Sequence, residues 1–434
     1  MDKMADVLGR VGAWCGQNKY LSAIKNAFQN FMPLTIAGAI GVLWCNVLVN
    51  DQTGLGLFFK PIMALDFLNP AFQAVNFCTI SCITVGITLG IAQEIGIWNM
   101  GAERAGYIPG LVGLAAWLSV TNTSHMVDGA KEAFTGIAGN ELGATGLFTG
   151  MIIGVLSVEL FCFFEKQDAL KIKMPEQVPP GVARAFEVLV PATITLIITA
   201  CIGSACYNLT GLYLNDVIKN GIQGPLGAVG ATIPGVMIIY LVIMLFWLVG
   251  IHGNNMLSAV KEALFTPLAL ENVEAFNKGE TPKNIINMYF LQMCGEFGGS
   301  GVTIGLVIAI MIFGKREDNK AIASLSLVPG LFNINETVTF GIPMVLNPIL
   351  GIPFVFACLV TILVGYVLTV IGFCPVACLT VPWTTPPIVF GFLATGANVM
   401  GAVTQAILIV VSTVIYTPFL IAYEKYQNKQ AAEA

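Results

Sequence analysis

A single carboxylate, Glu336, lies in a long apolar part of the sequence. Between Ala321 and Tyr423 it is the only Asp, Glu, Lys, Arg or His. A charged carboxylate at membrane depth is costly unless a cavity, a counter-charge or a proton compensates for it. Its neighbours form a polar island, made of Asn333, Asn335, Thr337 and Thr339. We therefore expect Glu336 to be functional rather than a residue of helix packing or a glutamate that reaches the interface.

His252 has glycine on both sides, in Gly250-Ile251-His252-Gly253, and Asn254 and Asn255 follow. Glycine permits a tight turn and lets backbone approach a ligand closely. A lone histidine is usually structural, but this context favours a ligand contact. We predict that His252 and Asn254 belong to a binding site.

Two other segments carry weaker signals. Gly298-Gly299-Ser300-Gly301 precedes an apolar run, although small residues in membrane helices usually serve close packing. Trp383, in Val-Pro-Trp-Thr-Thr-Pro-Pro, lies in a proline-broken segment, where an indole either packs or stacks on a sugar ring. The sequence contains no G-x-x-x-x-G-K-[ST] or G-x-G-x-x-G motif, so energy coupling requires an ion gradient or a partner protein. We expect no metal and no cofactor.

The elements that position these residues must be membrane helices. The chain is 56% hydrophobic and 10% charged, with mean hydropathy +0.80, whereas soluble domains carry about 25% charged residues. Much of its surface must face lipid, and no basic tract suggests nucleic acid. Apolar segments of spanning length lie near 31–49, 74–97, 107–121, 144–165, 188–210, 233–250, 301–314, 354–373 and 398–423.

Basic residues orient the chain. They cluster in 1–27, 166–184 and 315–320 and at the end of the chain, which places these segments and both termini in the cytoplasm. If successive spans alternate in direction, the loop 315–320 is cytoplasmic only when residues 251–300 contain an extra crossing or a re-entrant hairpin. Prolines interrupt 321–395, and irregular backbone at membrane depth survives only around protein or a water-filled cavity. Interrupted hydrophobic segments point to the binding site of a transporter.

These patterns divide the chain near residue 185. Residues 1–185 predict a scaffold or dimerisation half, which opens with an amphipathic leader over 1–30 and closes with the proline-containing linker 166–187. Residues 186–434 predict the transport half, because they contain the broken segments and the polar residues.

Three motifs in order, Gly250-Ile251-His252-Gly253, Gly298-Gly299-Ser300-Gly301 and Asn333-Ile334-Asn335-Glu336, resemble the membrane component IIC of the phosphoenolpyruvate-dependent sugar phosphotransferase system, in its lactose/cellobiose/chitobiose group. The resemblance extends from Asn26-Ala27-Phe28 to Pro418-Phe419. It implies an all-α polytopic protein of the bacterial cell membrane, with about ten transmembrane helices, re-entrant hairpins and a homodimer formed through the N-terminal half.

The resemblance also implies the chemistry. A disaccharide would bind in the C-terminal half, and a phosphocysteine on component IIB, loaded by IIA upstream, would phosphorylate its 6-hydroxyl. Glu336 and His252 would be the catalytic pair beside that hydroxyl. A carboxylate is a reasonable general base, and an imidazole can donate to the reacting oxygen. The substrate-binding residues that we predict with them are Asn254, Asn333, Asn335, Trp383 and Ser300.

One position departs from the family. Proline usually follows the motif glutamate, whereas this chain has Thr337, which restores a backbone N–H. The chain ends at Ala434, soon after the last predicted span, so we expect IIB to be a separate protein. Two other functions remain open from the sequence: a proton-coupled secondary sugar transporter that titrates Glu336, and a membrane scaffold or receptor that transports nothing.

Overall fold

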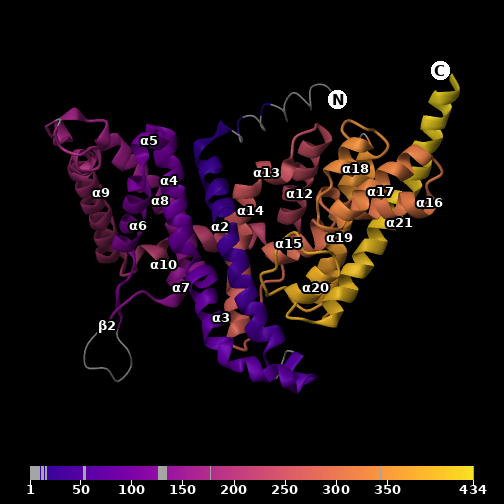
Figure 1. Cartoon of the computed structure of the whole chain (residues 1–434), viewed down its shortest axis with the longest axis horizontal. Helices are drawn as coiled ribbons and strands as arrows, with labels where there is room; N and C mark the ends of the chain where they lie inside the picture. Colours follow the sequence, from indigo (N-terminus) through magenta and orange to yellow (C-terminus); the bar gives the residue numbers. More distant parts are fainter. Residues whose placement is uncertain are drawn as a thin grey trace. The chain divides into compact units, whose positions relative to one another are not determined.

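The computed structural model describes residues 10, 14, 17–51, 55–125, 134–175, 177–342 and 344–433. Figure 1 shows that these residues are mostly helical. The sheet structure of the described residues is one antiparallel pair of two-residue strands, β1 (Ser124–His125) and β2 (Phe134–Thr135). The prediction of an all-helical polytopic membrane protein is confirmed.

Five helices in the described part of the chain are long and apolar enough to cross a membrane, or up to seven if each of two bent helix pairs forms one span. The five are Lys19–Leu48, Ala144–Glu165, Pro180–Thr210, Gly351–Val370 and Val399–Gln430. The bent pairs are Lys60–Ser81 with Ile83–Met100, at 42°, and Met288–Val302 with Ile304–Phe313, at 59°. Shorter apolar helices occupy Ile108–Val120 and Ile233–Leu248.

The chain groups into two compact units. Unit 2 comprises 17–35 and 77–227, and its elements after α2 (Lys19–Leu43) are η4 (Phe77–Ser81), α4 (Ile83–Met100), α5 (Ala102–Ala105), α6 (Ile108–Val120), β1, β2, α7 (Gly139–Leu142), α8 (Ala144–Glu165), η5 (Asp168–Leu170), α9 (Pro180–Thr210), α10 (Leu214–Ile218) and η6 (Lys219–Gln223). Helix α11 (Gly224–Gly230) extends across its end.

Close packing of small residues holds the helices of unit 2 together. A Cβ at Gly113 of α6 would lie 2.3 Å from the Cβ of Ala92 in α4, and one at Gly150 of α8 would lie 2.1 Å from the Oγ1 of Thr88. Small residues allow membrane helices to approach this closely. The three helices α4, α6 and α8 therefore pack backbone against backbone.

An ion-pair network closes one end of unit 2. Glu165, at the end of α8, is buried and accepts hydrogen bonds from the Nε of Arg104 at 2.9 Å and the Nη1 of Arg184 at 2.8 Å. Glu187 accepts from the same two arginines, at 3.0 and 2.7 Å. Because Arg184 lies in the predicted linker, the network attaches that linker to α8. Helix α9 begins at Pro180, before the predicted span at 188, because proline is favoured in the first helical turn.

Unit 1 comprises 36–76 and 228–434, together with the first 16 residues, most of which lie outside the described part. Its elements are η1 (Trp44–Leu48), η2 (Leu55–Leu57), η3 (Lys60–Leu68), α3 (Asn69–Asn76), α12 (Ile233–Leu248), α13 (Gly253–Met256), α14 (Ser258–Asn277), α15 (Met288–Gly295), η7 (Ser300–Val302), α16 (Ile304–Phe313), α17 (Glu317–Leu331), α18 (Glu336–Gly341), α19 (Gly351–Val370), α20 (Val389–Ala394) and α21 (Val399–Glu433).

A continuous apolar core in unit 1 joins α12, α14, α15, α16, α19 and α21. Gly305 of α16 meets Ser412 of α21 so closely that a Cβ there would lie 2.1 Å from the serine Oγ. The predicted interruptions within 321–395 are present as the short helices α18 and α20 and the irregular backbone around α19. Residues 251–300, where we expected an extra crossing or hairpin, contain α13, α14 and α15.

The predicted amphipathic leader falls largely on residues outside the described part. From Lys19 onwards the chain forms α2, which continues past Phe31 without a break, so the leader and the first span are not separate helices there. The functional division near residue 185 stays a prediction, because the compact units are discontinuous in sequence and follow packing rather than function.

Candidate functional site

The glycine segment after α15 forms a turn that requires glycine. Gly298, Gly299 and Gly301 have φ of +67°, +88° and +76°. A Cβ at Gly299 would lie 2.6 Å from the Cβ of Asn335, and one at Gly301 would lie 2.5 Å from the ring of Phe354. Glycine supplies both the left-handed backbone and the space. The turn therefore leaves room for the segment that carries Asn335 and the motif glutamate, Glu336.

Asn333 connects this turn to a third segment. Its Oδ1 accepts a hydrogen bond from the backbone N–H of Gly298 at 2.6 Å, and its Nδ2 donates to the backbone carbonyls of Trp383 at 2.5 Å and Thr385 at 3.0 Å. Asn333 has φ +63°, a conformation that asparagine tolerates better than most residues. One amide side chain thus fixes three irregular segments to one another.

Asn335 and Asn254 meet at Ser300. The Nδ2 of Asn335, which is buried, donates to the backbone carbonyl of Ser300 at 2.8 Å, and the Nδ2 of Asn254 donates to the Ser300 hydroxyl at 3.0 Å. The Oδ1 of Asn254 is buried and has no hydrogen-bond partner among the described residues. A buried acceptor of this kind is unfavourable unless a donor reaches it. A ligand hydroxyl that donates to this oxygen would remove the cost, as expected for a residue of a binding site.

His252 is fixed by the helix that it begins. It is the N-cap of α13, where its Nδ1 accepts a hydrogen bond from the backbone N–H of Asn255 at 3.2 Å. In the neutral ring the proton must then lie on Nε2. The ring packs against Trp247 at a centroid distance of 4.4 Å.

The protonated nitrogen of His252 faces Glu336. Nε2 and the Glu336 Oε1 are 4.0 Å apart, and the two side chains are 38% and 49% exposed, so both face open space. This distance is too long for a direct hydrogen bond, but a hydroxyl oxygen beside the line that joins the two atoms would lie about 2.8 Å from each. Such a hydroxyl would accept from the imidazole and donate to the carboxylate.

The structure thus brings together all seven residues that the sequence predicted. Glu336 begins α18 directly after Asn335, and His252 lies opposite it. Trp383 is half exposed and joins the group through its backbone. Thr337 is the second residue of α18, where an N–H has no partner within the helix. The N–H that threonine restores is therefore not required by the helix itself.

A charged group near this site was missed by the sequence analysis. Lys261 of α14 forms an ion pair with Glu296, which also accepts a hydrogen bond from the hydroxyl of Tyr240 at 2.7 Å. The Lys261 and Glu296 side chains are only 8% and 18% exposed, so each charge depends on the other. The available signal was a lysine within an apolar helical stretch and a glutamate just before the glycine turn.

A polytopic helical fold with a polar site among broken membrane segments defines a membrane transporter. The comparisons with known proteins define the class further, because residues 25–358 match the family described as "Phosphotransferase system, EIIC". The chain belongs to this family, the membrane-embedded sugar permeases of the phosphotransferase system.

The chain is similar over its length to several members. It is 33% identical to the oligo-beta-mannoside-specific EIIC component of Bacillus subtilis strain 168, covering 98% of this chain and 94% of that protein. It is 30% identical to the cellobiose-specific EIIC component of Lactococcus lactis subsp. lactis strain IL1403, covering 98% of both. The crystal structure of ChbC, the IIC component from the N,N'-diacetylchitobiose-specific system, matches with TM-score 0.88, 29% identity and 98% coverage of each chain.

Proposed function

We propose that this protein carries a neutral disaccharide of the cellobiose or chitobiose type into the cell, and that a partner IIB protein phosphorylates the 6-hydroxyl during transport. The observation that carries the proposal is the 4.0 Å separation between the His252 Nε2 and the Glu336 Oε1. One hydroxyl group placed beside this pair would meet a donor on His252 and an acceptor on Glu336. The names of the similar proteins support a saccharide of this type.

In the proposed reaction, the sugar oxygen attacks the phosphorus of the IIB phosphocysteine. Glu336 takes the hydroxyl proton, the new O–P bond forms, and the S–P bond breaks so that the cysteine leaves as a thiolate. The Nε2–H of His252 orients the attacking oxygen by donating to one of its lone pairs. General-base catalysis of this kind contributes about 10²–10⁴-fold to a rate.

The assembly that we propose follows the same family pattern. Two copies pair through residues 1–185, each with about ten transmembrane helices and re-entrant hairpins in residues 186–434. Both termini lie in the cytoplasm, where IIB, loaded by IIA, reaches the sugar. The clustering of basic residues in 1–27, 166–184 and 315–320 supports this orientation, and the 59° bend before α16 suits a re-entrant segment.

The test is to supply phosphoenolpyruvate and the soluble components to membrane vesicles that contain the protein, with cellobiose as the sugar. We expect cellobiose 6-phosphate as the product, while a 6-deoxy analogue binds and yields no phosphate ester. A transporter that titrates Glu336 to couple sugar to protons would instead deliver unmodified sugar. Free cellobiose as the transported product would therefore refute the proposal.

A further inference from the structure

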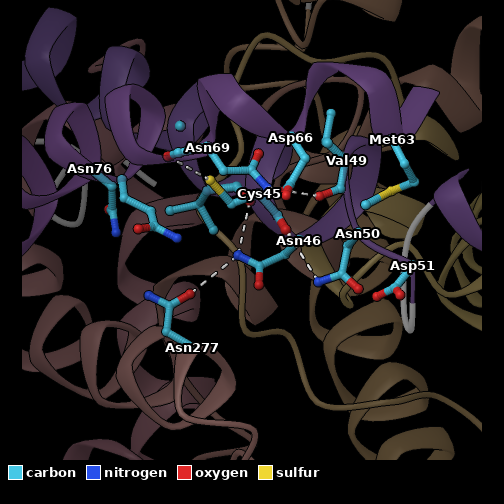
Figure 2. A pocket seen from close by; sticks show the side chains of 13 residues that line it. Cys45, Asn46, Val49, Asn50, Asp51, Met63, Asp66, Asn69, Asn76 and Asn277 are labelled. Atoms are coloured by element: carbon cyan, nitrogen blue, oxygen red, sulfur yellow. Dashed lines mark hydrogen bonds between the residues drawn. The ribbon is translucent and has the colours of Figure 1, made fainter. Parts of the chain in front are cut away.

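A polar cavity, of about 540 Å³, lies at the end of α2 and shares no lining residue with the site at His252 and Glu336. Small-molecule sites have volumes of about 300–1,000 Å³. Figure 2 shows the 13 residues that line it. Five are asparagines, and Gln73, Asp51 and Asp66 add further amide and carboxylate oxygens. The walls come from residues 41–76 and from Asn277, the last residue of α14.

The walls of this cavity are held in a defined shape. The π-helical turn η1 interrupts the regular helix at Trp44–Leu48, and turns of this kind occur frequently at functional sites. Trp44 stacks on Phe72 of α3 at 4.2 Å and 12°, which joins the two walls. Asn46 donates to the Oδ1 of Asn277 at 3.3 Å, so the end of α14 is attached to the same cavity (Figure 2).

The lining selects a neutral ligand with many hydroxyl groups. It contains two carboxylates and, among the described residues, no lysine, arginine or histidine, which disfavours an anion. No group of three or more His, Cys, Asp or Glu in the described part of the chain is arranged to hold a metal ion. Amide side chains both donate and accept, as sugar hydroxyls do.

The side chain of Asn69 adds a hydrogen-bond acceptor to the lining. The Nδ2 of Asn69 donates to the carbonyl of Val49 at 3.3 Å and also to Asp66. Its Oδ1 is buried and has no hydrogen-bond partner among the described residues. A buried acceptor without a donor is unfavourable, and a ligand hydroxyl would satisfy it.

We propose that this cavity is a second saccharide-binding subsite, on the outer side of the membrane, that receives the neutral sugar before it reaches His252 and Glu336. The choice of sugar and the outer location rest on the proposed function and orientation. The cavity lies at the far end of α2 from its first residue, which is the outer side when the N-terminus is cytoplasmic.

Cys45 lines the cavity and provides a test on the unmodified chain. The purified full-length protein is treated with N-ethylmaleimide, with and without cellobiose, and labelling of each cysteine is followed by peptide mass spectrometry. Reactivity follows the unoccupied fraction, so cellobiose at about ten times its dissociation constant slows labelling of Cys45 about tenfold. Labelling of Cys201, an exposed cysteine of α9, is unchanged. Betaine at equal osmolality controls for solute effects.

Variants separate direct protection from a change of conformation. Asn50→Leu combined with Asn277→Leu removes the protection of Cys45, while Asn208→Leu on α9 retains it. Glu336→Ala combined with His252→Ala also retains it, because the two sites share no lining residue. If this last variant loses the protection, or if cellobiose never protects Cys45 in the wild type, the subsite is refuted. Protection of Cys45 without any sugar phosphate as product would instead preserve the subsite and refute the proposed function.

Discussion

The Nδ2 of Asn335 donates a hydrogen bond to the backbone carbonyl of Ser300 at 2.8 Å, so the residue before Glu336 is attached to the glycine turn that follows α15. The Oδ1 of Asn333 accepts from Gly298 in the same turn. The carboxylate is therefore positioned by a hydrogen-bonded frame from another part of the chain, and the space for that frame exists because Gly299 has no side chain.

Gly299→Ala is expected to destabilise the protein and weaken sugar binding. Its φ of +88° and ψ of −177° fall in a region that only glycine adopts readily, and the added Cβ would lie 2.6 Å from Asn335. Gly279→Ala is the matched control, since Gly279 has φ +73° but nothing within 4 Å of the added Cβ. Backbone strain alone costs about 1–3 kcal/mol in this region. Thermal unfolding in detergent measures the difference, and equal losses would show that the contact with Asn335 is unimportant.

Glu336→Gln should preserve sugar binding and slow phosphorylation about 10²–10⁴-fold, or about 3–5 kcal/mol of barrier. Glutamine keeps the shape and hydrogen-bonding capacity of glutamate but cannot take the proton. The assay is initial rate with the complete soluble system, beside equilibrium binding of the sugar. Glu317→Gln, at an exposed position of α17, is the matched control. Near wild-type phosphorylation by Glu336→Gln would disprove the assignment of the base.

Two substitutions of His252 should separate its role as the N-cap of α13 from its role in phosphorylation. His252→Asn retains a good N-cap side chain for α13 but loses the Nε2–H that faces Glu336. His252→Ala loses both, and the missing cap costs about 0.5–2 kcal/mol of stability. We expect both variants to phosphorylate slowly and only His252→Ala to unfold at a lower temperature. If His252→Asn phosphorylates at the wild-type rate, the imidazole serves only as a cap.

Glu296→Gln should destabilise the protein by about 3–5 kcal/mol, because it removes the carboxylate that pairs with the buried Lys261. Adding Lys261→Met should recover most of this loss, since the remaining pair has no charge to bury. The comparison is a double-mutant cycle by thermal unfolding of the detergent-purified protein. Additive effects of the two substitutions would mean that the two side chains do not depend on each other.

The sequence marked candidate site residues where a residue contradicted its surroundings. Glu336 is a carboxylate in an apolar stretch, and His252 and Ser300 stand among glycines, so composition alone marked them. Lys261 and Glu296 were missed because they are 35 residues apart and the favourable pairing exists only in the folded chain. Local patterns likewise gave the bounds of α8, but not the 59° bend before α16, which depends on packing against distant segments.

The continuous helix α21 has a consequence for movement during transport. Along its length, the Oε1 of Gln405 accepts from the backbone N–H of Ile388 and Gly391 at 2.7 Å each, and Tyr416 donates to the carbonyl of Gly301 at 2.8 Å. Glu424 accepts from the backbone N–H of Lys315 at 2.8 Å. Helix α21 thus connects the segment around Ile388, the glycine turn at Gly301 and the loop at Lys315. These parts cannot slide past one another without breaking these hydrogen bonds, so we expect them to move together during transport.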